Sequence, residues 1–235
     1  MTDWNISPEE WTVIGLSLKV SLAAVIAMLP ISFAFAWILA RWRFPGKLLL
    51  DTAVHLPLVV PPVVTGWMLL LLFGANGPIG RWLLDWFGVT LLFRWTGAAL
   101  AAGIMALPLM TRAMRLSIEA VDRRLEDAAR TLGAGRFRVF RTIALPLSLP
   151  GILAGTVLGF ARAIGEFGAT ITFVSDIPGE TRTLPIAIYS ALQMPGAEAA
   201  VSRLAIISVL LSLGALLISE LLARKAGRGV HSHVL

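Results

Sequence analysis

Few residues of this sequence have the type and spacing that catalysis requires. Cysteine is absent, and histidine occurs only at positions 55, 231 and 233. Neither a His-Glu-x-x-His zinc motif nor a Gly-x-Ser-x-Gly nucleophile turn occurs. The phosphate-binding pattern fails at Gly46-Lys47, because Arg41 occupies the position of its first glycine. We therefore expect a chain that is not an enzyme and that binds neither a metal nor a cofactor.

Charged residues within apolar stretches are the remaining candidates for a functional role, because inserting a charge into a membrane is costly. Arg162 and Glu166 are four residues apart, so they either form a local ion pair or leave Arg162 to face an anion in a transport path. Lys19 can extend its long stem to the outer interface or contact a substrate. Asp51 and His55 repeat the four-residue spacing and predict a structural hydrogen bond.

The overall composition explains why catalytic residues are scarce. Hydrophobic residues make up 57% of the 235 positions and charged residues 14%, whereas a soluble domain has about 25% charged residues. The mean hydropathy is +0.81. This balance excludes a soluble globular enzyme, a disordered tail and a disulfide scaffold, and it indicates an integral membrane protein.

Five segments are long and apolar enough to cross a hydrocarbon core of about 30 Å. They lie at about 13–39, 52–73, 95–111, 147–164 and 204–222. The third and fourth are rich in glycine and alanine, which permit close helix contacts, so we expect both to face protein. Residues 167–175 and 184–192 are too short to cross and predict a re-entrant or interfacial pair. The sequence thus predicts an all-α membrane protein with about five transmembrane helices in one domain, residues 1–235.

Basic residues fall on one side of this five-span arrangement. Cytoplasmic loops collect lysine and arginine, which places the N-terminus outside and the C-terminus inside. The net charge of +6 is therefore explained by the membrane, and we expect no nucleic-acid partner. The fourteen residues on the inner side are Arg41, Arg43, Lys47, Arg112, Arg115, Arg123, Arg124, Arg130, Arg136, Arg138, Arg141, Arg224, Lys225 and Arg228.

The longest inner loop, residues 112–146, has a helical pattern of its own. Apolar residues recur at helical spacing from 118 to 132, with Ser117 as the predicted N-cap and Gly133 as the residue that ends the helix. A second short helix follows, and Pro146 and Pro150 are expected to mark the turn back into the membrane. The sequence predicts a helix-turn-helix that projects into the cytoplasm, although an amphipathic loop on the membrane surface would have the same periodicity.

The spacing within this loop distinguishes the two interpretations. The residues Asp127-Ala128-Ala129, Gly133 and Ile143-Ala144-Leu145-Pro146 resemble the Glu-Ala-Ala-x3-Gly-x9-Ile-x-Leu-Pro signature of ABC-importer permease subunits. Asp127 occupies the glutamate position, with Glu126 directly before it. The resemblance implies a type I ABC-importer permease fold whose inner loop couples to an ATPase. The coupling residues that it implies are Glu126, Asp127, Ala128, Ala129, Gly133, Leu145 and Pro146.

Two further segments extend the resemblance. Residues 55–64 and 165–183 look like the corresponding parts of molybdate ABC transporter permeases. This likeness implies a homodimeric channel in the bacterial inner membrane, a cytoplasmic ABC ATPase dimer that holds ATP-Mg, and a periplasmic or extracellular molybdate-binding protein.

A tetrahedral dianion passing through the channel would need hydrogen-bond donors and few fixed negative charges. Core packing is the alternative role for the threonines among the candidates. Charge and size do not separate molybdate from tungstate or sulfate, and an ion-coupled secondary carrier is the other class considered. The candidate pathway residues are Thr65, Arg162, Gly165, Glu166, Gly168, Thr170 and Thr172.

Overall fold

The computed structural model describes residues 6–231, except for the side chains at 219, 220 and 222–231. His233 lies outside the described residues, as does the side chain of His231. All regular secondary structure within residues 6–231 is helical, which confirms the predicted fold class. The helices are α1 (Pro8–Arg41), α2 (Lys47–Val59), α3 (Pro62–Phe73), α4 (Pro78–Phe87), α5 (Trp95–Glu119), α6 (Arg123–Thr131), α7 (Arg136–Val139), α8 (Leu145–Ile164), α9 (Gly168–Val174), α10 (Leu184–Leu192) and α11 (Glu198–His231), with one π-helical turn at Phe140–Ala144.

Four helices are long and apolar enough to cross a membrane, and they correspond to four of the five predicted spans. They are α1, α5, the continuous helix from Arg136 to Ile164, and α11. The remaining predicted span, residues 52–73, corresponds to α2 and α3, which together are long and apolar enough to cross but meet at a bend of 115°. Pro61 and Pro62 explain the break, since neither has an N–H to continue the helical hydrogen bonds.

The centre of the bundle is α5, which packs between α1 and α8. Glycines of α8 allow this close approach: a Cβ at Gly151 would lie 2.1 Å from the Ser117 Cβ, and one at Gly159 would lie 2.5 Å from the Met110 Cγ. Met110 and Met114 on α5 are fully buried. The prediction that the third and fourth spans face protein through small residues is therefore confirmed.

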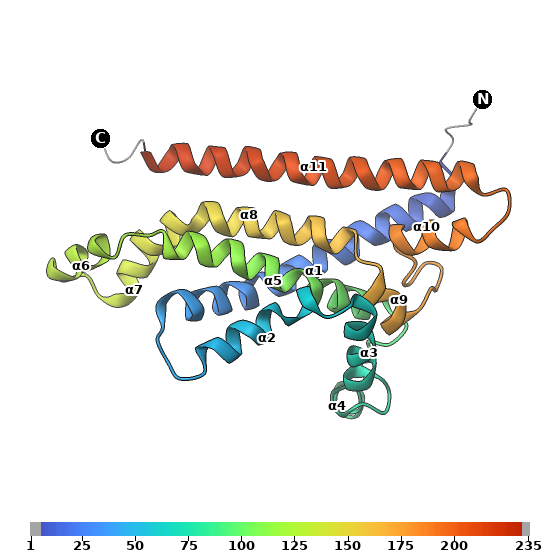
Figure 1. Ribbon diagram of the computed structural model, residues 1–235, viewed down its shortest axis with the longest axis horizontal. Coiled ribbons are helices and arrows are strands. Elements are labelled where there is room, and N and C mark those ends of the chain that lie inside the picture. The colour runs from blue at the N-terminus through green and yellow to red at the C-terminus, as the bar shows by residue number, and fades with distance from the viewer. Residues whose placement is uncertain (1–5, 232–235) are drawn as a thin grey trace.

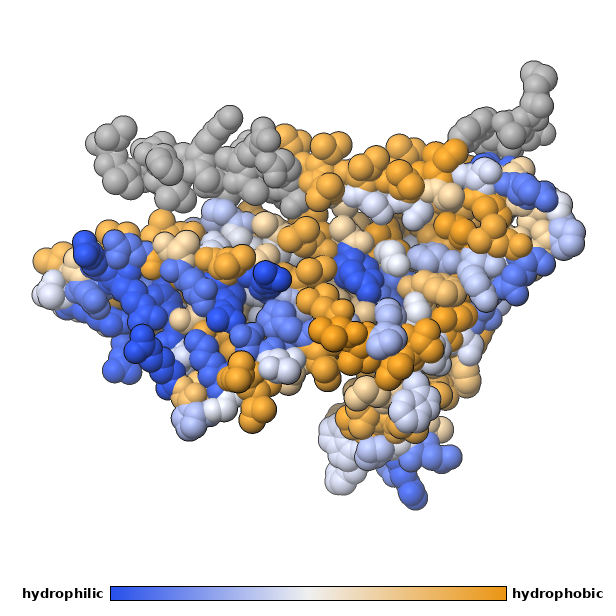
Figure 2. Space-filling model, viewed as in Figure 1, coloured by the Kyte–Doolittle hydropathy of each residue, from blue (hydrophilic) through white to orange (hydrophobic). Residues whose placement is uncertain are grey.

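The two ends of the bundle differ in character. The helices α6 and α7 lie at one end with the C-terminal end of α11, whereas α10 and the start of α1 lie at the other (Figure 1). Hydrophilic residues gather over the α6–α7 end, and apolar residues cover the middle of the same face (Figure 2). The predicted short pair, residues 167–175 and 184–192, forms α9 and α10, neither of which is long enough to span.

Candidate coupling loop and translocation path

The first helix of the 112–146 loop begins later than its sequence pattern suggests. The predicted N-cap at Ser117 is wrong, because α5 continues to Glu119 and the Ser117 hydroxyl donates to the Ser148 carbonyl at 3.2 Å. Asp122 caps α6 instead, and its side chain accepts the Arg124 N–H at 2.9 Å. Ser117 therefore joins α5 to α8, and the projecting helix is only nine residues long.

Gly133 ends α6 as predicted. Its φ of +84° is a left-handed conformation, which glycine adopts without steric cost. The Gly133 N–H donates to the Arg130 carbonyl and the Ala134 N–H to the Ala129 carbonyl, both at 3.0 Å. These two bonds form a Schellman motif, which fixes the direction of the chain after the helix.

The second helix of the loop continues into the membrane without a turn. Residues from Arg136 to Ile164 form one helix, so the turn predicted at Pro146 and Pro150 is wrong. A π-helical turn precedes Pro146, where the Leu145 N–H donates to the Phe140 carbonyl. The wider turn accommodates a proline that lacks an N–H. Leu145 and Pro146 therefore lie in a rigid connection between the loop and α8.

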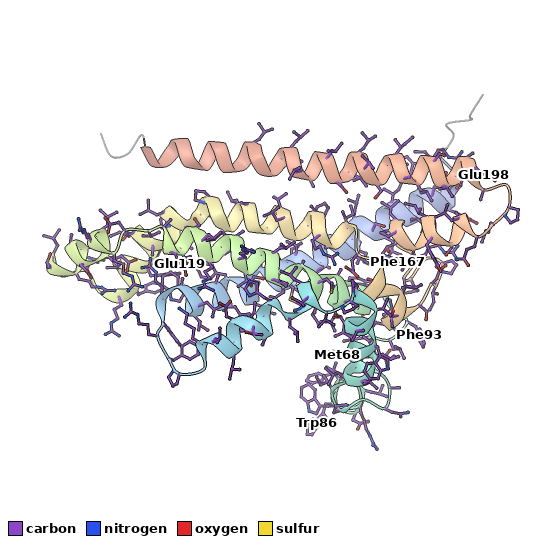
Figure 3. All side chains as sticks on the ribbon, in the orientation of Figure 1. Met68, Trp86, Phe93, Glu119, Phe167 and Glu198 are labelled. Carbon is purple, nitrogen blue, oxygen red and sulfur yellow. The ribbon has the colours of Figure 1, made fainter. Side chains whose placement is uncertain are left out.

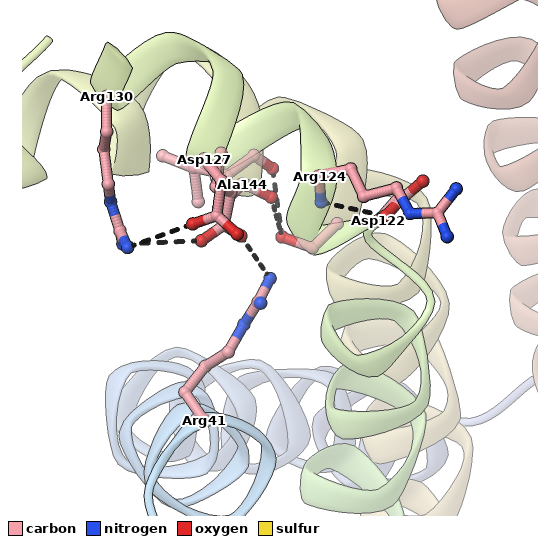
Figure 4. Close-up of polar contacts among 9 residues, drawn as sticks. Arg41, Asp122, Arg124, Asp127, Arg130 and Ala144 are labelled. Atoms are coloured by element: carbon pink, nitrogen blue, oxygen red, sulfur yellow. Dashed lines mark hydrogen bonds and ion pairs between the residues drawn. The ribbon is translucent and has the colours of Figure 1, made fainter. Parts of the chain in front are cut away.

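Neighbouring carboxylates on α6 face opposite environments. Glu126 Oε1 lies 2.6 Å from the Arg41 Nη2 at the end of α1, and these side chains are 11% and 10% exposed. Asp127 is 70% exposed and contacts only the Arg130 guanidinium, at 3.5 Å, among the described residues. Figure 4 shows Arg41 reaching from α1 to this site. Glu126 thus tethers the loop to the bundle, whereas Asp127 lies on the exposed side of α6.

Aromatic packing provides a second tether between the loop and α1. The Phe140 ring lies 5.0 Å from the Trp37 ring in an edge-on arrangement and 6.3 Å from the Phe33 ring. Such pairs stabilise by about 0.5–1.5 kcal/mol beyond their buried area. The loop is therefore connected to α1 by an ion pair and by packed aromatic rings.

The outer surface of α6 exposes an apolar stripe. Leu125 is 51% exposed and Leu132 is 89% exposed, with exposed Ala128 between them on the same helical face. Ile118 and Val121, which begin the predicted apolar face, are buried in the bundle instead. Leu125, Ala128 and Leu132 therefore remain largely uncovered by the described residues of this chain.

The candidate pathway residues lie near the other end of the bundle. The predicted ion pair between Arg162 and Glu166 is present, and Glu166 also accepts the Ala169 N–H at 2.9 Å. Thr65 and Thr170 are buried, and they belong to α3 and α9, which pack together. Gly168 fits against α3 so closely that a Cβ there would lie 2.8 Å from the Pro62 Cβ.

Few of the candidate pathway residues are exposed. Gly165 is exposed at the end of α8, and Arg162 is partly exposed, whereas Glu166 is 3% exposed. Thr172 is partly buried, and its hydroxyl donates to the Gly168 carbonyl at 2.8 Å. The structure therefore brings the seven candidates into one region of α3, α8 and α9.

Two charged residues form contacts that sequence spacing alone does not identify. Arg115 pairs with Asp51 at 2.9 Å and so links α5 to α2, across 64 residues of sequence. The predicted contact between His55 and Asp51 is present at 3.1 Å. Lys19 is exposed, and its Nζ lies 3.8 Å from the centre of the Trp95 ring, a cation–π contact. A tryptophan thus stabilises the charge of Lys19 within the first span.

Comparison with known proteins identifies the family. Residues 28–228 match the family model described as binding-protein-dependent transport system inner membrane component. The chain is 60% identical over 227 residues to the molybdenum transport system permease protein ModB of Escherichia coli strain K12, covering 95% of this chain and 99% of the relative. It is 54% identical to ModB of Haemophilus influenzae, over 92% of this chain and 94% of that protein.

Solved structures show the same fold at low sequence identity. A bacterial ABC transporter involved in the import of the acidic polysaccharide alginate aligns with a TM-score of 0.73 and 19% identity. The alignment covers 93% of this chain and 80% of that chain. The signature loop, the bundle and these comparisons lead to one conclusion: the chain belongs to the inner-membrane permease components of binding-protein-dependent ABC transport systems.

Proposed function

We propose that this chain is the membrane permease subunit of an ATP-driven importer of molybdate. The strongest support comes from the different environments of neighbouring residues on α6. Glu126 holds the loop to the bundle, while Asp127 and the apolar stripe remain exposed. The 60% identity to a molybdenum transport permease supports the choice of substrate. We infer that residues 1–235 form one permease domain and that two copies assemble around the path.

The partners follow from this assignment. A cytoplasmic ABC ATPase dimer would hold ATP-Mg and grip the 112–146 loop, and an external molybdate-binding protein would deliver the anion. The basic residues around the loop support a cytoplasmic location for it, with the N-terminus outside and the C-terminus inside. The α6–α7 end and the end of α11 lie together in Figure 1, as this orientation requires.

The geometry of the loop explains how movement of the ATPase would reach the spans. A push on α6 would pass through the Arg41–Glu126 pair to α1, and through the continuous helix from Arg136 to α8. Because α1 and α8 both pack on α5, the bundle would respond as a unit. ATP and the loaded binding protein would each shift the equilibrium by contacting one state better than the other.

Each signature residue has a distinct role in this proposal. Gly133 sets the bend, and the small side chain of Ala128 lets the ATPase approach the helix backbone closely. Asp127 offers a charge to the partner surface. Ala129 is half-buried beneath that surface. Leu145 and Pro146 join the loop to α8 through the π-helical turn.

The outer region around α3, α8 and α9 would form part of the path for the anion. Glu166 neutralises Arg162, so the path would hold little net charge there. An unpaired arginine would bind a dianion tightly and slow its release, since charge-assisted hydrogen bonds are roughly twice as strong as neutral ones. Selectivity would then reside mainly in the external binding protein.

Reconstituted transport tests the proposal. The permease, its ATPase and its binding protein in proteoliposomes should take up radioactive molybdate only with ATP, and excess sulfate should compete weakly. Preferred uptake of sulfate or tungstate would replace the substrate. Uptake driven by an ion gradient without the ATPase would instead indicate a secondary carrier.

A further inference from the structure

Two adjoining pockets lie where the end of α1 meets the 112–146 loop. The first has a volume of about 520 Å³ and is bounded by α1, α6, α7 and the π-helical turn; we call it the arginine pocket. The second, of about 550 Å³, lies between α1 and α7, and we call it the aromatic groove. Trp37, Arg136 and Phe140 line both of them. A single elongated ligand can therefore occupy the two pockets together.

The arginine pocket has an excess of positive charge. Four arginines line it against two carboxylates. Both carboxylates belong to α6, and they already pair with two of these arginines, Arg41 and Arg130. The other two, Arg123 and Arg136, are exposed and form no ion pair with any residue that the structure describes. Two cationic side chains without a partner in one pocket favour a ligand with negative charge.

A larger pocket at the same end of the bundle has balanced charge instead. It lies between α2 and α5, has a volume of about 630 Å³, and is lined by two arginines and two carboxylates. Its Arg115 pairs with Asp51 at 2.9 Å and with Glu119 at 2.8 Å. Figure 3 places Glu119 at this end of the bundle. An anion is therefore expected to prefer the arginine pocket.

The aromatic groove offers a surface for an apolar part of the ligand. All of its lining side chains are aromatic or aliphatic, except for Arg136. Phe137, which lines it, is 74% exposed. Inorganic phosphate or molybdate would gain nothing from this surface, because neither has apolar area to bury. A ligand that joins a phosphate to a hydrocarbon chain matches both pockets.

The two pockets lie at the depth where a membrane lipid presents its phosphate. The spanning helix α1 ends at Arg41 and is followed by Trp42, which is 57% exposed. Tryptophan is enriched at membrane–water interfaces. The spanning helix that begins at Arg136 starts beside it, since the Phe140 and Trp37 rings are 5.0 Å apart. Basic pockets between helices on the cytoplasmic side of a membrane bind anionic lipid headgroups.

The arginine pocket and the surface proposed for the ATPase lie on different faces of α6. With 3.6 residues per turn, Arg123 and Arg130 lie roughly 140–160° around the helix from Leu125. Leu132 lies close to Leu125 on the exposed apolar stripe, as its spacing of seven residues requires. A lipid in the arginine pocket and an ATPase on the stripe can therefore contact α6 at the same time.

We propose that the arginine pocket and the aromatic groove together bind one anionic phospholipid of the inner leaflet, with its phosphate at Arg123 and Arg136 and an acyl chain along Phe137. This site goes beyond the transport function and depends on the cytoplasmic location proposed for the loop. Because Arg123 belongs to α6 and Arg136 to α7, the headgroup would contact both helices of the loop. The lipid would then hold the loop to the bilayer, in addition to the Arg41–Glu126 pair.

Native mass spectrometry of the permease–ATPase complex tests this site. The complex, purified through a tag on the ATPase, would be stripped of lipid and titrated with phosphatidylglycerol or with phosphatidylcholine, which has no net charge. We expect each permease copy to retain one phosphatidylglycerol tightly and no phosphatidylcholine. Replacing Arg123 and Arg136 together with glutamine should weaken phosphatidylglycerol binding by roughly 30-fold, about 5-fold for each arginine.

The matched control removes the same charge beside the site. Arg124→Gln with Arg138→Gln changes two exposed arginines of α6 and α7 that line neither pocket, and it should leave binding near wild type. Equal retention of the two lipids, or equal losses in the two double variants, would mean a general attraction of lipid to a basic surface. Either result would overturn the site.

Two further measurements distinguish a lipid from a small anion. Phe137→Ser should also weaken phosphatidylglycerol binding, because it removes the apolar contact of the acyl chain. Millimolar sodium molybdate or sodium phosphate should leave the lipid bound. Displacement by either salt, or unchanged binding in Phe137→Ser, would overturn the lipid as the occupant. Because the ATPase has already co-purified, none of these outcomes would count against the permease function.

Discussion

The Arg41–Glu126 pair offers the sharpest test of how the loop is held. Replacing Glu126 with glutamine removes the charge that balances Arg41, while keeping a side chain of similar size. Both side chains are about nine-tenths buried, and removing one partner of a buried pair costs roughly 3–5 kcal/mol. We expect the lower end, about 3 kcal/mol, because the polar amide oxygen can still lie against the Arg41 guanidinium. That energy corresponds to a roughly 100-fold shift in the equilibrium between docked and open loop.

The assay is hydrogen exchange of the α6 backbone amides, supported by trypsin cleavage at the exposed Arg123, Arg124 and Arg130. In nanodiscs without the ATPase, Glu126→Gln should raise exchange in residues 123–134 by about two orders of magnitude. Asp127→Asn is the matched control one residue away. Its contact is exposed, so its cost should be within about 0.5 kcal/mol and its exchange should stay near wild type.

A double variant tests whether the lost protection comes from an uncompensated buried charge. Replacing Arg41 and Glu126 together with methionine leaves no uncompensated charge and should recover most of the lost protection. If Glu126→Gln exchanged no faster than Asp127→Asn, the loop would not be held by this pair. The proposed transmission of ATPase movement from α6 to α1 through the Arg41–Glu126 pair would then be wrong.

Three further variants test other elements. Gly133→Val should lower ATPase co-purification while membrane insertion persists, because a β-branched residue is strained at φ +84°; Gly135→Val, at φ −65°, is the control, and equal losses would contradict the proposed bend. Gly151→Ala should lower the melting temperature in detergent, at a cost of about 1–3 kcal/mol, because its Cβ would meet Ser117. Gly214→Ala, in open space on α11, should not. Burial raises the pKa of the Asp176 carboxyl, but hydrogen bonds from Arg182 and Ser190 lower it more, so its net pKa is below the usual 3.8. The ionised Asp176 carboxylate therefore stabilises the folded 175–183 loop fully above pH 3.8, and this stabilisation is lost as the pH falls below that value. Protease cleavage of the loop should thus stay constant from pH 7 to 5. Asp176→Asn should increase cleavage already at pH 7, and no increase would refute the role of this pair.

Hydropathy predicts the spanning helices well because the bilayer imposes a minimum length of apolar sequence. The small-residue faces of α5 and α8 are also predictable, since close packing leaves glycine where a Cβ would clash. The break at Pro61 is harder to predict, because proline is tolerated inside membrane helices when neighbours satisfy the backbone. Hydropathy does not reveal whether a helix continues through its prolines or breaks at them.

Local sequence is less informative about the ends of the loop helices. Ser117 is a good N-cap by type, but its hydroxyl bonds to Ser148 on another helix, a tertiary contact that no local pattern contains. The inward and outward roles of Glu126 and Asp127 likewise depend on where the end of α1 lies. The signature spacing places both carboxylates next to each other on one helix, whereas only the three-dimensional structure separates their environments.

The affinity of the ATPase for the permease in nanodiscs, compared between wild type and Leu132→Glu, shows whether the ATPase binds the exposed tip of α6. Leu132 is 89% exposed at the tip of α6, and burying a leucine stabilises a contact by about 1.5–3 kcal/mol. Replacing it with a charge should weaken binding of the ATPase by roughly 10- to 100-fold, while Arg81→Glu on α4 should leave the dissociation constant unchanged. An unchanged dissociation constant for Leu132→Glu would mean that the ATPase does not bind this part of the loop.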